Sequence, residues 1–162
     1  MSMIGHLLRV TPSELEAYKT DSALLENRIY SGTTDPNLVD IDKAWNGILF
    51  LLTGQGLENL DHPLSGVFFS GQLLDEDQDL GYGPAHYVTP GQVQELHAAI
   101  SVITTDELRQ KFDAKKMTEL EIYPDVWEHE DTPDYLVEYF ETIQEVYATA
   151  AQHGEAVITF IN

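Results

Sequence analysis

Apolar residues form short strand-like runs at both ends of the chain and helix-like stripes between them. The runs near residues 2–10 and 156–161 predict a strand at each end. Two further apolar runs bounded by turn residues, near 66–72 and 84–88, predict two more strands. The clearest helix is predicted at about 133–153, where apolar residues recur every three or four positions.

Capping residues mark where the other helices begin. Glu14, Gln92 and Glu107 each lie three residues after a threonine, so Thr11, Thr89 and Thr104 predict three capping boxes. The first two also have a proline at the first helical position. The helices predicted from caps and stripes cover residues 12–27, 42–53, 90–102, 104–112 and a short segment that starts at Asp113. Strands at both ends with helices between them indicate one α+β domain over 1–162. We expect a small mixed sheet that includes both terminal strands, packed with several helices.

The charge of the chain narrows the classes of partner. It carries 28 Asp and Glu against 8 Lys and Arg, a net charge of −20, and residues 117–162 contain neither Lys nor Arg. A net charge of −20 excludes nonspecific nucleic-acid binding, which relies on cationic groups that displace phosphate counterions, and docking on an anionic membrane through a polybasic patch. A charged partner is therefore expected to be cationic.

Cysteine is absent, which excludes disulfides, a thiolate nucleophile and a cysteine-built zinc site. No apolar run approaches the length of a membrane span, and the first residues do not have the pattern of a signal peptide. We expect a cytoplasmic protein.

The candidate metal and catalytic motifs do not have the residue spacing that such sites require. Asp75, Asp77 and Asp79 alternate as in a calcium loop, but the glycine and glutamate that an EF-hand needs are misplaced. The acidic stretch 128–131 has no pair of ligands on one helix face. A nucleophile elbow and a phosphate-binding loop are also missing. We therefore predict no metal site, no cofactor and no identifiable catalytic residue.

Three stretches together resemble a known family. They are DIDKAWNGILFLLTG at 40–54, YGPAHYVTP at 82–90, and LRQKFDA followed by EIYPDVW within 108–127. In this order and at this spacing they are similar to the YfbM-like family, a bacterial group of unknown function. The resemblance covers essentially the whole chain. It implies an α+β protein of about this size and supplies neither an activity nor site residues.

Aromatic and ionisable residues in those stretches form the candidate binding site. Large aromatics with a polar group often line pockets and interfaces, and loop segments gather functional residues. The candidate residues are Tyr82, His86, Tyr123, Asp125 and Trp127. Core packing is the ordinary alternative for the aromatics among them.

Three functions remain open at this point. The first is a binding protein, of inhibitor or immunity type, for a basic protein. The second is an enzyme for a small cationic or neutral substrate, with His86 and Asp125 as its acid–base pair. The third is an accessory domain without activity of its own. We favour the first, and the sequence does not predict an oligomeric state.

Overall fold

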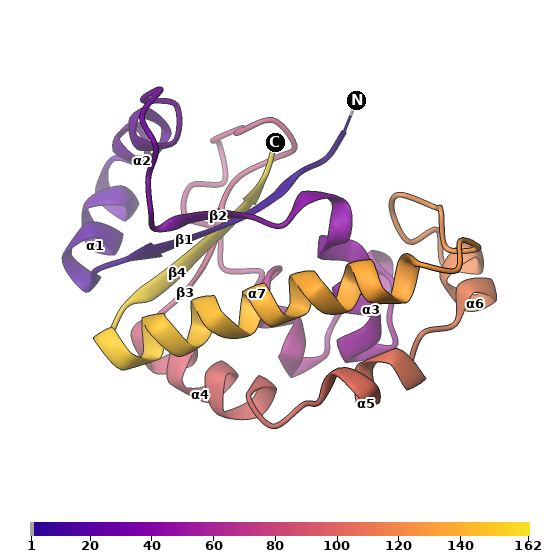
Figure 1. Cartoon of the computed structure of the whole chain (residues 1–162). Coiled ribbons are helices and arrows are strands. Elements are labelled where there is room, and N and C mark those ends of the chain that lie inside the picture. The colour runs from indigo at the N-terminus through magenta and orange to yellow at the C-terminus, as the bar shows by residue number, and fades with distance from the viewer. Residues whose placement is uncertain (1) are drawn as a thin grey trace.

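The computed structural model describes residues 2–162 and places a four-stranded antiparallel sheet among the helices (Figure 1). The strands are β1 (Gly5–Val10), β2 (Leu38–Asp40), β3 (His86–Val88) and β4 (Ala156–Ile161), in the order β2-β1-β4-β3. The two terminal strands pair along their full length, from Gly5 opposite Ile161 to Val10 opposite Ala156. This confirms the expected α+β fold with both terminal strands in the sheet.

The helices connect and cover these strands. They are α1 (Pro12–Thr20), α2 (Ser22–Ile29), α3 (Trp45–Thr53), α4 (Pro90–Ile100), α5 (Thr105–Gln110), α6 (Ala114–Glu119) and α7 (Thr132–His153). Single 3₁₀ turns occur at η1 (Asp42–Ala44), η2 (Leu57–Asn59) and η3 (Pro63–Val67). Two of the three predicted capping boxes form, since Thr11 bonds reciprocally with Glu14 and Thr89 with Gln92. At the third, Thr104 caps the helix by accepting from the N–H of Glu107, without the reciprocal bond.

The sheet has a hydrophobic core on each face, because every residue of β4 is buried. Leu8 and Ile158 face the smaller core, which α1 and α2 complete. Leu7 and Val157 face the larger core with residues of α3, α4 and α7. Figure 1 shows α1 and α2 at one side of the sheet and the long α7 on the other side. The sheet is therefore the middle layer of the molecule.

Helix α3 is buried along almost its whole length, from Trp45 to Leu52. It lies so close to its neighbours that a Cβ on Gly47 would come within 2.8 Å of both Leu136 and Trp127. A glycine is needed here because these side chains leave no room for a methyl group. Gly54 then ends the helix in the left-handed conformation, as predicted.

Three sequence predictions need correction. The sheet is antiparallel at every pairing, so it is not a mixed sheet. The short strand β2 was not predicted, because its three residues are too few to show a period. The helix predicted at 12–27 is two helices, because Asp21 ends α1 and caps the first turn of α2.

The strand predicted near 66–72 is also wrong. Residues 63–67 form a 3₁₀ turn, and the carbonyl of Ser65 accepts hydrogen bonds from the N–H groups of Phe68 and Phe69. Their backbone groups are thus used locally instead of in a ladder. The segment forms no ladder with the sheet and contacts it through separate hydrogen bonds, in which the N–H of Tyr87 donates to the carbonyl of Gln72 and the hydroxyl of Thr159 donates to the carbonyl of Phe68. Just beyond it, Leu73 and His86 form an isolated bridge. Its apolar character arises from burial of Val67 and Phe68, not from strand pairing.

Candidate functional site

The five predicted site residues do not form one pocket. Tyr82 and His86 line one hollow of about 280 Å³ beside β3 and β4. Asp125 and Trp127 line another of about 300 Å³ between α6 and α7, and Tyr123 lines neither. The structure therefore groups Tyr82 with His86 and separates both from the other three residues.

The hollow at His86 is mainly apolar. It is lined by Phe68, Phe69, Leu73, Tyr82, Pro84, His86, Thr159, Phe160 and Ile161. The backbone N–H of Gly71 donates to Nδ1 of His86 at 3.0 Å, so the proton of the neutral ring is on Nε2. Burial lowers the pKa of His86, which keeps the ring neutral at physiological pH. None of the lining residues is an Asp or Glu, so the predicted pairing of His86 with Asp125 does not form in this hollow.

Tyr123 and Trp127 are packing residues. The hydroxyl of Tyr123 accepts a hydrogen bond from the backbone N–H of Met3 at 2.9 Å, and its ring stacks on Trp45 at a centroid distance of 5.9 Å. The indole of Trp127 is buried and donates to the carbonyl of Ile122 at 2.7 Å. Through these two residues, the segment between α6 and α7 packs against the core.

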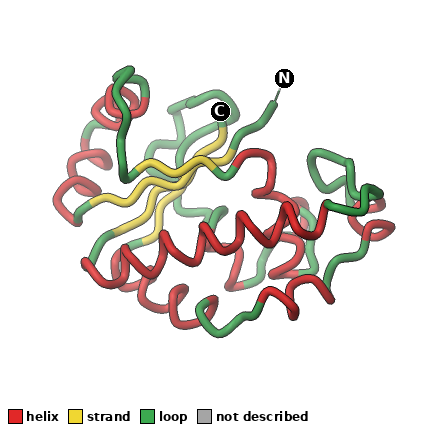
Figure 2. Tube along the Cα trace, in the orientation of Figure 1, coloured by secondary structure: helices red, strands yellow, loops and turns green. Residues whose placement is uncertain are grey.

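This fastened segment carries an unusual density of negative charge. We call residues 119–131 the acidic loop; Figure 2 shows most of it as the loop that leads into the long α7. Its carboxylates are all exposed and are those of Glu119, Glu121, Asp125, Glu128, Glu130 and Asp131. Within residues 2–162, no cationic side chain lies within ion-pair distance of any of them. The loop therefore presents six exposed carboxylates that form no ion pair within residues 2–162.

A narrow cleft of about 220 Å³ opens at one edge of the acidic loop. It is lined by Asn46, Gly56, Leu57, Glu58, Asn59, Glu119, Leu120 and Glu121. The side-chain oxygen of Asn46 accepts a hydrogen bond from the backbone N–H of Tyr123 at 2.9 Å. Its Nδ2 is buried and has no partner within the described chain. Sequence analysis missed Asn46, although a lone amide inside the apolar run of α3 was a usable signal.

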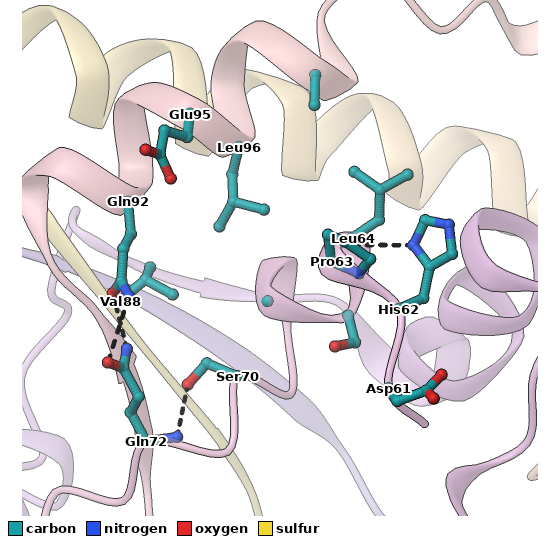
Figure 3. Close-up of a pocket in the computed structure, with 13 residues that line it drawn as sticks. Asp61, His62, Pro63, Leu64, Ser70, Gln72, Val88, Gln92, Glu95 and Leu96 are labelled. Atoms are coloured by element: carbon teal, nitrogen blue, oxygen red, sulfur yellow. Dashed lines mark hydrogen bonds between the residues drawn. The ribbon is translucent and has the colours of Figure 1, made fainter. Parts of the chain in front are cut away.

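A larger hollow, of about 510 Å³, lies between η3 and α4 (Figure 3). Its central polar groups bond to one another or to the backbone. The amides of Gln72 and Gln92 meet at 2.7 Å, and the Ser70 hydroxyl donates to the carbonyl of Tyr87 at 2.7 Å. The carboxylates of Asp61 and Glu95 lie at opposite ends of the hollow in Figure 3. His62 also lines the hollow, and its Nδ1 accepts a hydrogen bond from the backbone N–H of Leu64 at 3.0 Å.

The acidic run near Asp75 is explained by local hydrogen bonds. The hydroxyl of Ser22 donates to Asp75, and the N–H groups of Gly81 and Gly83 donate to Asp79. These bonds lower the pKa of both carboxyl groups, because they favour the charged form. The run therefore shapes a surface loop, in line with the failed calcium spacing.

Within residues 2–162, no group of three or more His, Asp or Glu side chains is placed to hold a metal ion. No helix formed by these residues combines the length and apolar character that crossing a bilayer requires.

Comparison with known proteins gives a consistent result. Residues 1–160 match the family described as a domain of unknown function, DUF1877. Protein YfbM of Escherichia coli strain K12 is 29% identical over 133 residues, which cover 78% of this chain and 75% of that protein. The crystal structure of YfbM, a protein of unknown function from Escherichia coli, superposes with a TM-score of 0.75 at 23% identity, covering 99% of this chain and all of that chain. The chain belongs to the DUF1877 family and has the YfbM fold.

Proposed function

We propose that this protein is an acidic binding module for a basic protein, of the inhibitor or immunity type. The observation that carries the proposal is the acidic loop, whose six exposed carboxylates have no cationic partner among the described residues. Uncompensated charge on one surface attracts an oppositely charged partner over a distance and accelerates its association.

The support of the loop adds to this argument. Tyr123 accepts a hydrogen bond from Met3 and the Trp127 indole is buried in the core, so binding a partner requires little ordering of the backbone. Exposed apolar side chains lie within it or beside it, among them Leu57, Leu120 and Val126. A basic protein would therefore meet both charge and apolar area on one preformed surface.

The first variant to test removes charge from the loop alone. Glu119, Glu121, Glu128 and Glu130 are changed to Gln. Binding is measured by surface plasmon resonance against small proteins of pI above about 9, and against acidic proteins, at low and moderate salt. We expect the wild type to bind a subset of the basic proteins with salt-sensitive association. We expect the loop variant to lose roughly tenfold or more in affinity, about 1.4 kcal/mol, because several charges facing the partner are removed together.

A matched control separates the loop from the overall charge. Glu26, Glu76, Glu138 and Glu141 are changed to Gln, and each of these residues is exposed and without an ion pair in residues 2–162. The control loses as much charge as the loop variant but keeps the loop intact. Equal loss of affinity in the two variants would contradict the proposal, since net charge alone would then account for binding.

The other functions have less support. The enzyme alternative needs an acid–base pair, and the hollow at His86 contains no carboxylate among its lining residues. An accessory domain without activity is the outcome if no basic protein binds. The proposal includes a cytoplasmic location, which rests on the lack of cysteine.

A further inference from the structure

The cleft beside Asn46 combines an unsatisfied donor with a negatively charged rim. We infer that it holds a lysine side chain from an exposed segment of the basic partner, with the Asn46 amide donating to a backbone carbonyl next to that lysine. This inference rests on the proposed function and assigns it a point of contact.

Asn46 provides the first part of the argument. The side chain is only 2% exposed, and buried amides normally satisfy both their oxygen and their nitrogen. Here Oδ1 is occupied by the N–H of Tyr123, whereas Nδ2 has no partner in residues 2–162. Since Asn46 lines the cleft, Nδ2 is the group it can offer to a ligand there. Because the Nδ2 group is a hydrogen-bond donor, its ligand must supply an acceptor. Every polypeptide carries such acceptors in its peptide carbonyl groups.

The walls and rim provide the second part. Leu57 and Leu120 are exposed apolar side chains in the lining, and Glu58, Glu119 and Glu121 bring three exposed carboxylates. A lysine has the complementary form, since its methylene stem packs on apolar surface while its ammonium group stays at a polar edge. The lining contains no Lys, Arg or His that would oppose this cation.

The size of the cleft excludes larger ligands. Its volume of about 220 Å³ is below the range of roughly 300–1,000 Å³ that is typical of sites for drug-sized molecules and cofactors. A single long side chain and part of its backbone are a better match. The two sides of the cleft, near residues 56–59 and 119–121, are far apart in sequence, and the bond from the N–H of Tyr123 to Asn46 attaches the second side to α3. The cleft is therefore formed before any partner arrives.

The test is an NMR titration of the wild-type protein labelled with nitrogen-15. The probe is acetyl-Ala-Lys-Ala-amide, and the same peptide with norleucine in place of lysine is the neutral control. Butylammonium, which has the cation but no carbonyl, is the second control. We expect the lysine peptide to shift the Asn46 side-chain amide signals and the Tyr123 N–H signal. The norleucine peptide should bind about tenfold more weakly, and butylammonium should leave the Asn46 amide signals in place.

Variants test the separate contributions of the Asn46 amide and of the carboxylates to peptide binding. Asn46→Asp keeps the acceptor for Tyr123 but replaces the donor with a further negative charge. Attraction by charge alone therefore predicts tighter binding of the lysine peptide, whereas our inference predicts binding weaker by roughly fivefold or more. Glu121→Gln, at an exposed position, should also weaken the peptide several-fold. Its matched control Glu128→Gln, in the neighbouring hollow, should not. The Glu121 variant decides the matter if Asn46→Asp fails to fold.

The inference and the proposed function can fail separately. Peptide shifts confined to Asp125, Val126 and His129 would overturn the lysine cleft while leaving an acidic binding surface. A wild-type spectrum that no lysine peptide perturbs would also overturn the cleft, even if basic proteins bind through the loop. Failure of basic proteins to bind in a salt-sensitive way would remove the proposed function itself.

Discussion

The segments 82–86 and 123–127 have similar sequences in outline but opposite roles in the structure. Each combines aromatic and ionisable residues next to a glycine or a proline. Tyr82 is 39% exposed and borders an open hollow, whereas Trp127 is 2% exposed and lies in the core. The difference comes from contacts with residues that are distant in sequence. In the segment 123–127, the ring of Tyr123 stacks on Trp45 and its hydroxyl accepts a hydrogen bond from the N–H of Met3. Aromatic residues near a turn therefore do not show whether a loop is packed against the core or exposed to solvent.

The strongest way to break this comparison is Trp127→Ala. Removing a fully buried indole leaves a cavity against Gly47 and α7 and also removes the hydrogen bond to Ile122. We expect the free energy of unfolding to fall by about 3–5 kcal/mol. Urea denaturation followed by circular dichroism measures this loss.

Tyr82→Ala is the counterpart in the open segment and should change the free energy of unfolding by no more than about 0.5 kcal/mol. Comparable losses for the two variants would show that both segments are parts of the core. The comparison would then be wrong.

A smaller effect is expected from single hydroxyl groups. Tyr123→Phe leaves the N–H of Met3 without its acceptor, which should cost roughly 0.5–1.5 kcal/mol. The hydroxyl of Tyr82 has no hydrogen bond to any residue of 2–162, so Tyr82→Phe should be neutral. Thermal melts of the two variants side by side provide the measurement, and an equal shift in both would count against the assigned roles.

The smallest effect concerns pH. Burial lowers the pKa of His86 below its ordinary value of 6.5, so the unfolded chain takes up a proton more readily than the folded protein. The stability that His86 contributes is thus complete above about pH 6.5 and is lost as pH falls through the lower pKa of the folded state. His86→Gln retains an acceptor for the N–H of Gly71 but cannot titrate.

Melting temperatures measured from pH 7 to pH 5 should therefore fall less steeply for His86→Gln than for the wild type. Carboxylates titrate in both proteins, so the difference between the two curves isolates His86. Parallel curves would mean that the ring is solvated enough to titrate normally.

Elements whose pattern comes from local chemistry were predictable from the sequence. The apolar stripe of α7 is buried as expected at Leu136, Phe140 and Tyr147, and the caps at Thr11 and Thr89 form as expected. The residues near Val67 were wrongly predicted as a strand. A run of apolar residues indicates that the segment is buried, but it does not indicate which groups the backbone N–H and C=O bond to. The register of the terminal strands also needed the structure, since nothing local links Gly5 to Ile161.

The candidate site was less predictable, for a related reason. Tyr82 and His86 lie four residues apart in the sequence and share a hollow. The grouping with Tyr123, Asp125 and Trp127 failed because the path of the chain between them could not be inferred. Asn46 stood out only as a polar residue in an apolar helix. Its importance depends on Tyr123, which lies 77 positions further along the chain.

The central position of β1 and β4 has a consequence for how the protein forms during synthesis. Figure 1 shows these strands side by side, although they come from opposite ends of the described chain. Until residues 156–161 have left the ribosome, β1 has only the short β2 as a neighbour, and β3 has no strand to pair with. Helices near the N-terminus, such as α1, can form at this stage, but the complete sheet that separates the two hydrophobic cores cannot. Folding of the sheet is therefore delayed until residues 156–161 have been translated, and apolar surface of both cores stays exposed until then.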